Sequence, residues 1–158
     1  MGLEIERKFL LKDDGWRPGP PGISLRQGFL LNSDECTIRV RAMGTQAFIT
    51  IKGRTQGPVR LEYEYPIPVE DADELLVHFC QSPLIEKNRY IREYHGQKWE
   101  VDEFSGVNQG LIVAELELHS PDQEIRFPPW IGLEVTDDPR YLNANLAKRP
   151  FTTWGTAP

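Results

Sequence analysis

Charged side chains recur at every second residue in several short stretches of the chain. The first stretch carries Glu4, Glu6 and Lys8, which alternate with the apolar residues Ile5 and Phe9. Residues two apart in a β-strand project from the same face, so such a stretch carries its charges on one side. Carboxylates in such an array suit hard divalent cations, and arginine and lysine suit anions. The same spacing returns in Arg39 and Arg41, Lys52, Arg60, Glu62 and Glu64, Lys87 and Arg89, Glu100 and Asp102, and Glu115 and Glu117.

The surrounding sequence predicts eight strands and few helices. Alternation and turn residues place the strands at 3–10, 24–31, 35–42, 46–53, 59–65, 84–94, 98–104 and 111–119. An amphipathic helix is expected from Asp71, which would be its N-cap. A short C-terminal helix through about Lys148 is expected to begin with Asp138 as N-cap and Pro139 in its first turn. Residues 13–22 form a turn-rich loop in which Trp16 is expected to pack locally.

Two architectures satisfy this alternation. In one, the apolar faces form the core and the charges face solvent; in the other, the charges line the lumen of a closed barrel and helices cover its apolar outside. Five pairs of like charge occur at i and i+2, an arrangement that a solvated surface does not require. We therefore predict a mainly β (α+β) fold, an eight-stranded antiparallel β-barrel or tunnel with a charged lumen and a few helices outside. Strand ends leave the direction of Arg26, Arg60, Lys98 and Glu100 open.

Composition narrows the class of protein. The 158 residues suit one domain, and the net charge of −6 argues against nucleic-acid or anionic-membrane partners. No apolar run reaches the roughly 20 residues of a membrane span and the N-terminus lacks a signal-peptide pattern, so a cytoplasmic protein is expected. Cys36 and Cys80 are expected to be inert thiols, and the three histidines lack zinc-like spacing.

Glu4-Ile5-Glu6-Arg7-Lys8 resembles the ExExK motif of the CYTH superfamily, the triphosphate tunnel metalloenzymes. The other charged pairs follow in the order of that family, so the resemblance covers residues 1–158 as a single CYTH domain. It implies an eight-stranded tunnel that binds a triphosphate, and it is nearest to the bacterial-type inorganic triphosphatases. Only three residues precede Glu4, so the His-Phe pair that class IV adenylyl cyclases carry upstream of the motif is missing.

The resemblance implies a metal-dependent triphosphatase that cleaves tripolyphosphate to pyrophosphate and phosphate. The alternatives are a class IV adenylyl cyclase or a thiamine or nucleoside triphosphatase of the same family, and a noncatalytic polyphosphate-binding module. Two Mg²⁺ or Mn²⁺ ions would reconcile the carboxylates with an anionic substrate. A homodimer is left open.

The expected roles divide the charged residues into three sets. The substrate-binding set is Lys8, Arg39, Arg41, Lys52, Lys87 and Arg89. The catalytic set is Lys87, Arg89, Glu62 and Glu64. The metal-ligating set is Glu4, Glu6, Glu62, Glu64, Asp102, Glu115 and Glu117. Crowded carboxylates should have raised pKa values without metal, so Glu4→Gln or Glu64→Gln is expected to stabilise the metal-free protein.

Overall fold

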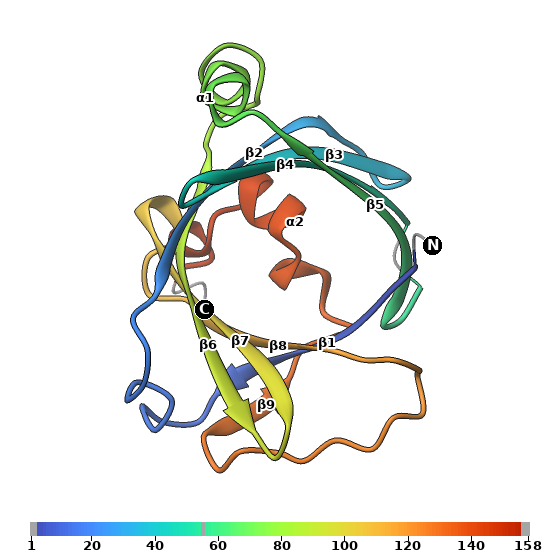
Figure 1. Ribbon diagram of the computed structural model, residues 1–158, viewed down its shortest axis with the longest axis vertical. Helices are drawn as coiled ribbons and strands as arrows, with labels where there is room; N and C mark the ends of the chain where they lie inside the picture. The colour runs from blue at the N-terminus through green and yellow to red at the C-terminus, as the bar shows by residue number, and fades with distance from the viewer. Residues whose placement is uncertain (1–2, 55, 156–158) are drawn as a thin grey trace.

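Eight antiparallel strands close into a barrel in the computed structural model, which describes residues 3–54 and 56–155 (Figure 1). They are β1 (Leu3–Leu11), β2 (Ile23–Asn32), β3 (Cys36–Met43), β4 (Gln46–Gly53), β5 (Val59–Ile67), β6 (Ile85–Tyr94), β7 (Gln97–Ser105) and β8 (Ile112–Glu117). Neighbours run in the order β5-β4-β3-β2-β6-β7-β8-β1, and a short β1–β5 pairing that includes Glu4 opposite Arg60 closes the ring. The predicted barrel is confirmed.

Alternation along each strand places the charges inside the barrel. Apolar residues between them form clusters on the outside, such as Ile5, Phe9, Trp99, Val101 and Leu116. Trp16 belongs to this cluster and is 1% exposed, with its ring 5.1 Å from that of Tyr90. The expectation of local packing was therefore wrong for Trp16, because the loop folds back over strands that are distant in the sequence.

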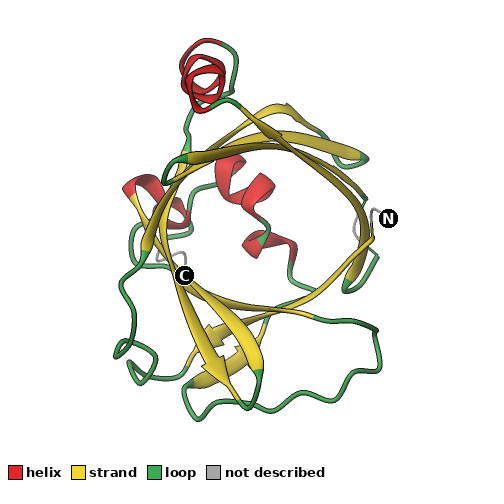
Figure 2. Ribbon diagram, viewed as in Figure 1, coloured by secondary structure: helices red, strands yellow, loops and turns green. Residues whose placement is uncertain are grey.

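Helix α1 (Val69–His78) covers the outside of β3 and β4, as the amphipathic pattern predicted (Figure 2). Its buried residues Ala72 and Leu76 pack on Val40. The expected cap was wrong: the N-cap is Pro68, and no side chain caps the helix. Asp71 lies in the first turn instead, where a carboxylate still favours the positive end of the helix dipole.

The C-terminal segment enters the barrel rather than covering it. Asp138 accepts a hydrogen bond from the backbone N–H of Arg140, as predicted for a cap, but this 3₁₀ turn, η2 (Pro139–Tyr141), ends at once. Leu142 is extended, and α2 (Asn143–Lys148) starts after it. In Figure 1, α2 lies within the ring of strands. Tyr141 and Leu146 fill one end of the lumen with Phe29, Ile85, Phe104, Leu111, Val113 and Val135.

Three smaller elements complete the described chain. Strand β9 (Ile131–Glu134), which the sequence did not predict, pairs with the C-terminal half of β1. The 3₁₀ turns η1 (Gly106–Asn108) and η3 (Phe151–Thr153) lie against each other. Cys36 and Cys80 are free, as expected. No helix of the described residues has the length and apolar character that a bilayer crossing requires.

Candidate functional site

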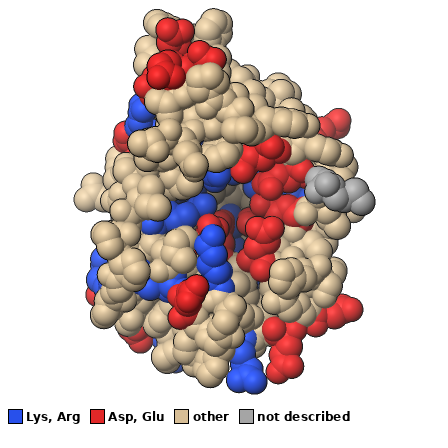
Figure 3. Space-filling model, in the orientation of Figure 1, with Lys and Arg blue, Asp and Glu red and all other residues tan. Residues whose placement is uncertain are grey.

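The barrel encloses a cavity of about 220 Å³ that is lined mainly by charged side chains. Figure 3 shows its mouth, with basic side chains gathered mainly on one side and acidic ones on the other. The lining comprises Glu4, Glu6, Lys8, Phe29, Thr37, Arg39, Arg41, Lys52, Arg60, Glu62, Glu64, Lys87, Arg89, Glu100, Glu115, Glu117, Leu142, Asn143 and Ala144. Every predicted site residue except Asp102 therefore faces one space, and so do Arg60 and Glu100, whose direction the sequence left open.

The two arginines of β3 provide hydrogen-bond donors that the protein leaves unused. Arg39 has no hydrogen bond or ion pair within the described part of the chain, and its Nε is buried. Arg41 Nη2 lies 3.5 Å from Glu64 Oε2, but the buried Arg41 Nε also has no partner. Burial and the neighbouring Arg39 lower the pKa of Arg41. A buried guanidinium without a full set of acceptors is prepared for an anionic ligand.

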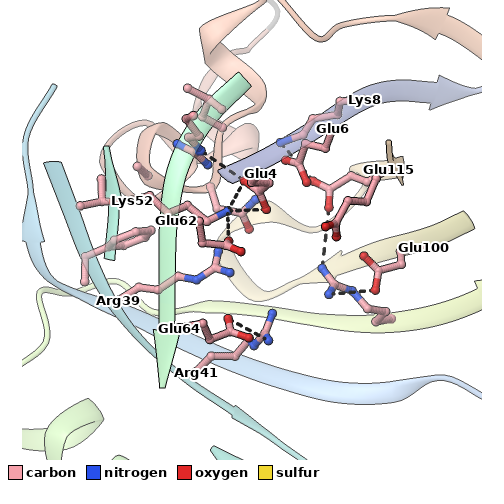
Figure 4. Close-up of a pocket in the computed structure, with 18 of the residues that line it drawn as sticks. Glu4, Glu6, Lys8, Arg39, Arg41, Lys52, Glu62, Glu64, Glu100 and Glu115 are labelled. Atoms are coloured by element: carbon pink, nitrogen blue, oxygen red, sulfur yellow. Dashed lines mark hydrogen bonds and ion pairs between the residues drawn. The ribbon is translucent and has the colours of Figure 1, made fainter. Parts of the chain in front are cut away.

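A second group of charges is largely neutralised by the protein itself. Lys52 Nζ lies 3.0 Å from Glu4 Oε1 and 3.2 Å from Glu62 Oε2, and it therefore joins β4 to β1 and β5 (Figure 4). Arg60 Nε lies 3.4 Å from the same Glu4 oxygen. Glu64 accepts a hydrogen bond of 2.8 Å from Thr50 Oγ1. These contacts hold the carboxylates Glu4, Glu62 and Glu64 in place beside the cavity.

Asp102 lies beneath the cavity surface and holds two cations. Its oxygens accept hydrogen bonds of 2.8 Å from Arg89 Nε and 2.9 Å from Arg89 Nη2, and Lys87 Nζ lies 2.8 Å away. Burial lowers the pKa of Lys87 to about 8, against the attraction of Asp102. Burial would raise the pKa of Asp102, but Lys87 and Arg89 lower it overall.

This geometry gives Asp102 a positioning role. The side chain is 2% exposed and both oxygens contact Lys87 or Arg89, so Asp102 positions these two side chains. Its role as a metal ligand stays a prediction. The sequence placed Asp102 on the correct face of the strand. The sequence could not show which cations contact Asp102, because this is set by the register of β6 and β7, which places Arg89 directly opposite Asp102.

Lys8 and Glu115 form a pair between neighbouring strands. Lys8 Nζ lies 3.2 Å from Glu115 Oε2, and Arg89 Nη2 lies 3.8 Å from Glu115 Oε1. Burial would raise the pKa of Glu115, but the charges of Lys8, Lys87 and Arg89 lower it to about 2. Lys8 Nζ also donates to the backbone carbonyl of Tyr141, 3.2 Å away.

Glu6 and Glu117 are the carboxylates without cationic partners. They lie directly opposite each other on β1 and β8, and neither has a hydrogen bond or ion pair within residues 3–54 and 56–155. Burial, Glu115 and Glu4 raise the pKa of Glu6. Burial raises the pKa of Glu117, and Glu4, Glu62 and Glu6 raise it further. Like charges placed opposite each other destabilise a strand pair, so the arrangement suits a bound cation.

The carboxylates do not form a complete metal cage. In the described residues no three Asp, Glu, His or Cys side chains are grouped so that they could hold a metal ion. Mg²⁺ is usually held by one or two carboxylates together with substrate phosphates, rather than by protein alone. Glu6 and Glu117 fit that donor set, and the ligand assignment stays a prediction.

Sequence reasoning missed Asn143 at the cavity wall. Its Oδ1 accepts hydrogen bonds of 3.0 Å from Lys87 Nζ and 2.9 Å from Gln27 Nε2. No alternation pattern could identify it, because Asn143 reaches the cavity from α2 and not from a strand. Of the other residues left open, Arg26 points outward and pairs with Asp73 of α1 at 2.8 Å, and Lys98 is exposed.

Comparisons with known proteins agree with this geometry. The model of the CYTH domain family matches residues 2–151. An inorganic triphosphatase of Acetivibrio thermocellus is 46% identical over 151 residues, covering 96% of this chain and 97% of that protein. An inorganic triphosphatase of Nitrosomonas europaea is 41% identical over 150 residues, covering 91% and 96%. A crystal structure of an inorganic triphosphatase has a TM-score of 0.66 and 38% identity, covering 93% of this chain and 95% of that one.

Proposed function

The chain belongs to the CYTH domain family, and from this premise we propose that it is an inorganic triphosphatase that uses a divalent metal ion to cleave tripolyphosphate to pyrophosphate and phosphate. One observation carries the proposal. The same cavity holds a cation that the described protein leaves unpaired, Arg39, and two unpaired carboxylates, Glu6 and Glu117. A polyanion bound with a metal ion supplies partners to both kinds of group at once.

We expect the arginine and lysine side chains that line the cavity to bind the substrate. Arg39 and Arg41 have free guanidinium donors that can bind phosphate oxygens bidentately, and Lys8 and Lys52 add point charges. These lysines are already paired with carboxylates, so they hold position before substrate arrives. A preorganised set of donors stabilises developing phosphoryl charge without reorganising during the reaction.

Glu6 and Glu117 would hold Mg²⁺ or Mn²⁺, with Glu4, Glu62, Glu64 and Glu115 close by. The ion, when bound, would neutralise phosphate charge and lower the pKa of a water molecule. The donor set is all oxygen, as these hard cations prefer. These six carboxylates thus divide into two unpaired ones for the ion and four that salt bridges or hydrogen bonds already hold in place.

The proposed chemistry is an in-line attack of water on a terminal phosphorus. The water oxygen forms the new P–O bond, the bridging P–O bond breaks, and pyrophosphate leaves with the electron pair. Glu62 or Glu64 accepts the proton of the water, and both line the cavity. Lys87 and Arg89, held by Asp102, stabilise the negative charge that develops on the leaving oxygen.

The lining favours a bare inorganic chain over a nucleotide or thiamine triphosphate. Phe29, Leu142 and Ala144 are the apolar members of the lining, and the rest of the wall is polar or charged. Such a wall offers little surface on which an aromatic base could stack. We further propose a cytoplasmic protein of one domain over residues 1–158, with a small-molecule substrate and neither nucleic acid nor membrane as a partner.

Phosphate release from tripolyphosphate, ATP and thiamine triphosphate, measured side by side with Mg²⁺ or Mn²⁺ and with EDTA, tests the proposal. We expect the highest kcat/KM with tripolyphosphate and none of the activity in EDTA. Formation of a cyclic nucleotide from ATP would instead support a cyclase. Calorimetry that shows tight tripolyphosphate binding without turnover, unaffected by metal, would support a binding module.

A further inference from the structure

The side chain of Asn143 links the C-terminal segment to the cavity wall at Lys87. Asn143 Oδ1 accepts hydrogen bonds from Lys87 Nζ and from Gln27 Nε2, so strands β6 and β2 meet at a single oxygen atom. Lys87 is 3% exposed and Gln27 is 0% exposed. The contact is therefore made at the buried edge of the cavity, where a hydrogen bond to a charged group contributes most.

The orientation of this amide follows from the chemistry of its partner. An ammonium group has three donors and no acceptor, so the atom of Asn143 that faces Lys87 must be the oxygen. Gln27 then turns its own amide nitrogen toward the same oxygen and leaves its buried Oε1 without a hydrogen bond. A buried carbonyl oxygen without a hydrogen bond is destabilising. Its presence at Gln27 therefore indicates that the contacts of Asn143 serve a function.

Asn143 does not use its side chain to start α2. Asparagine is favoured at the N-cap, but the N-cap of α2 is Leu142 and no side chain caps the helix. Tyr141, two residues before Asn143, offers its backbone carbonyl to Lys8 Nζ. Residues 141–143 thus present acceptors to lysines on two different strands of the predicted substrate-binding set.

We propose that Asn143 is a positioning residue that holds the ammonium group of Lys87 for the phosphoryl-transfer step, an inference that rests on the triphosphatase function proposed above. Asp102 and Asn143 together occupy two of the three N–H donors of Lys87. The third donor remains for an oxygen of the substrate. Without Asn143, the ammonium group has one fixed contact, and its position relative to the breaking bond becomes less defined.

The test compares substitutions at Asn143 with a matched control on the same helix. Asn143→Leu removes the acceptor at similar volume, and Asn143→Asp keeps an acceptor for both Lys87 and Gln27 but adds a charge. Asn145 provides the control, because its Nδ2 donates to the Pro139 carbonyl and it does not line the main cavity. Steady-state kcat and KM for tripolyphosphate with Mg²⁺ are measured with the melting temperature of each variant.

We expect Asn143→Leu to lower kcat by about tenfold or more, the size of a lost hydrogen bond to a charged group, with KM changed less than about threefold. Asn143→Asp should keep kcat within about threefold and raise KM, because its charge repels the substrate while the contact to Lys87 survives. Asn145→Leu should leave both constants within about twofold. Gln27→Leu removes the second donor to Asn143 and should also lower kcat. It replaces Asn143→Leu as the test variant if Asn143→Leu does not fold.

Two results would overturn the role of Asn143 without affecting the proposed triphosphatase function. One is an active wild-type protein whose kcat is unchanged in Asn143→Leu, or in Gln27→Leu if the former does not fold. The other is an equal loss of kcat in Asn143→Leu, Asn143→Asp and Asn145→Leu, which would show that docking of α2 is what matters. A wild-type protein that releases no phosphate from tripolyphosphate would refute the proposed function, and the inference with it.

Discussion

Asp102 holds Lys87 and Arg89, whose side chains are only 2% and 12% exposed, so its replacement by asparagine tests how these two cations are fixed beside the cavity. Asp102→Asn keeps the shape of the side chain and removes its charge. The carboxylate accepts hydrogen bonds from Arg89 Nε at 2.8 Å and Nη2 at 2.9 Å, and Lys87 Nζ lies at 2.8 Å. Asparagine offers one oxygen to these donors and turns an amino group toward the remaining cation.

The magnitude follows from the loss of one partner in a buried ion pair, which costs about 3–5 kcal/mol. Two other carboxylates stay near Arg89, with Glu100 Oε2 at 3.5 Å and Glu115 Oε1 at 3.8 Å. They offset part of the lost attraction, so we expect the low end, about 3 kcal/mol less free energy of unfolding. For a chain of this size that corresponds to a melting temperature lower by roughly 6–12 °C.

Chemical denaturation and thermal melting of Asp102→Asn at pH 7 measure this loss. Glu103→Gln is the matched control, because Glu103 follows on the same strand and also pairs with an arginine, Arg17, at 3.1 Å. That pair is open to solvent, with side-chain exposures of 32% and 44%, so its loss should destabilise the protein far less than the loss of the buried pair. Asp102→Asn should also lower kcat, since Lys87 and Arg89 lose their common anchor.

An Asp102→Asn protein that unfolds within about 1 kcal/mol of the wild type would contradict this reasoning. The same holds if Glu103→Gln destabilises the protein as much as Asp102→Asn does. Either result would mean that the cations on β6 are held by the wall as a whole and do not depend on the buried carboxylate.

Further predictions concern the remaining charges. In EDTA at pH 8, Glu6→Gln should have a higher free energy of unfolding than the wild type, by on the order of 1 kcal/mol. The reason is the raised pKa of Glu6, whose contribution to stability is present below pH 4.5 and is lost as the pH rises through the pKa of the folded state. A lower free energy of unfolding in Glu6→Gln would contradict this. The lowered pKa of Glu115 gives the opposite sign, so its contribution should be lost between about pH 4.5 and about 2, and acid titration of Glu115→Gln should lack that loss. Arg39→Ala should raise KM, whereas Glu62→Ala should chiefly lower kcat, and steady-state kinetics that do not separate them would show that they act as one unit.

The barrel could be predicted from the sequence because its signal is local. Seven of the eight strands alternate charged and apolar residues with period two, and repetition of that pattern fixes which face is which; β2 carries Arg26 as its one charge. Strand β9 could not be predicted, because its four residues after a pair of prolines are too few to show an alternation of polar and apolar side chains. The position of α2 could not be predicted because the signal of Asp138 and Pro139 indicates where a helix begins, without saying whether that helix lies inside or outside a barrel.

The distribution of ion pairs could not be predicted, because it depends on strand register. The crowding of carboxylates in the sequence predicts that Glu4→Gln or Glu64→Gln relieves repulsion in the metal-free protein. In the structure Lys52 and Arg60 neutralise Glu4, and Thr50 and Arg41 contact Glu64. The unpaired carboxylates are Glu6 and Glu117, which the register of β1 and β8 places opposite each other. We therefore expect the substitution of either of these two residues, and not of Glu4 or Glu64, to relieve repulsion in the metal-free protein.

The most direct test of the central claim is a ³¹P NMR time course of tripolyphosphate with the protein and Mg²⁺ in ¹⁸O-labelled water. The proposed function predicts that each tripolyphosphate yields one pyrophosphate and one phosphate, with ¹⁸O in the phosphate released from the chain end. It also predicts that Arg39→Ala and Glu6→Gln slow the reaction, because both remove groups that the cavity holds ready for substrate and metal. Tripolyphosphate that persists unchanged beside folded, metal-loaded protein would contradict the claim.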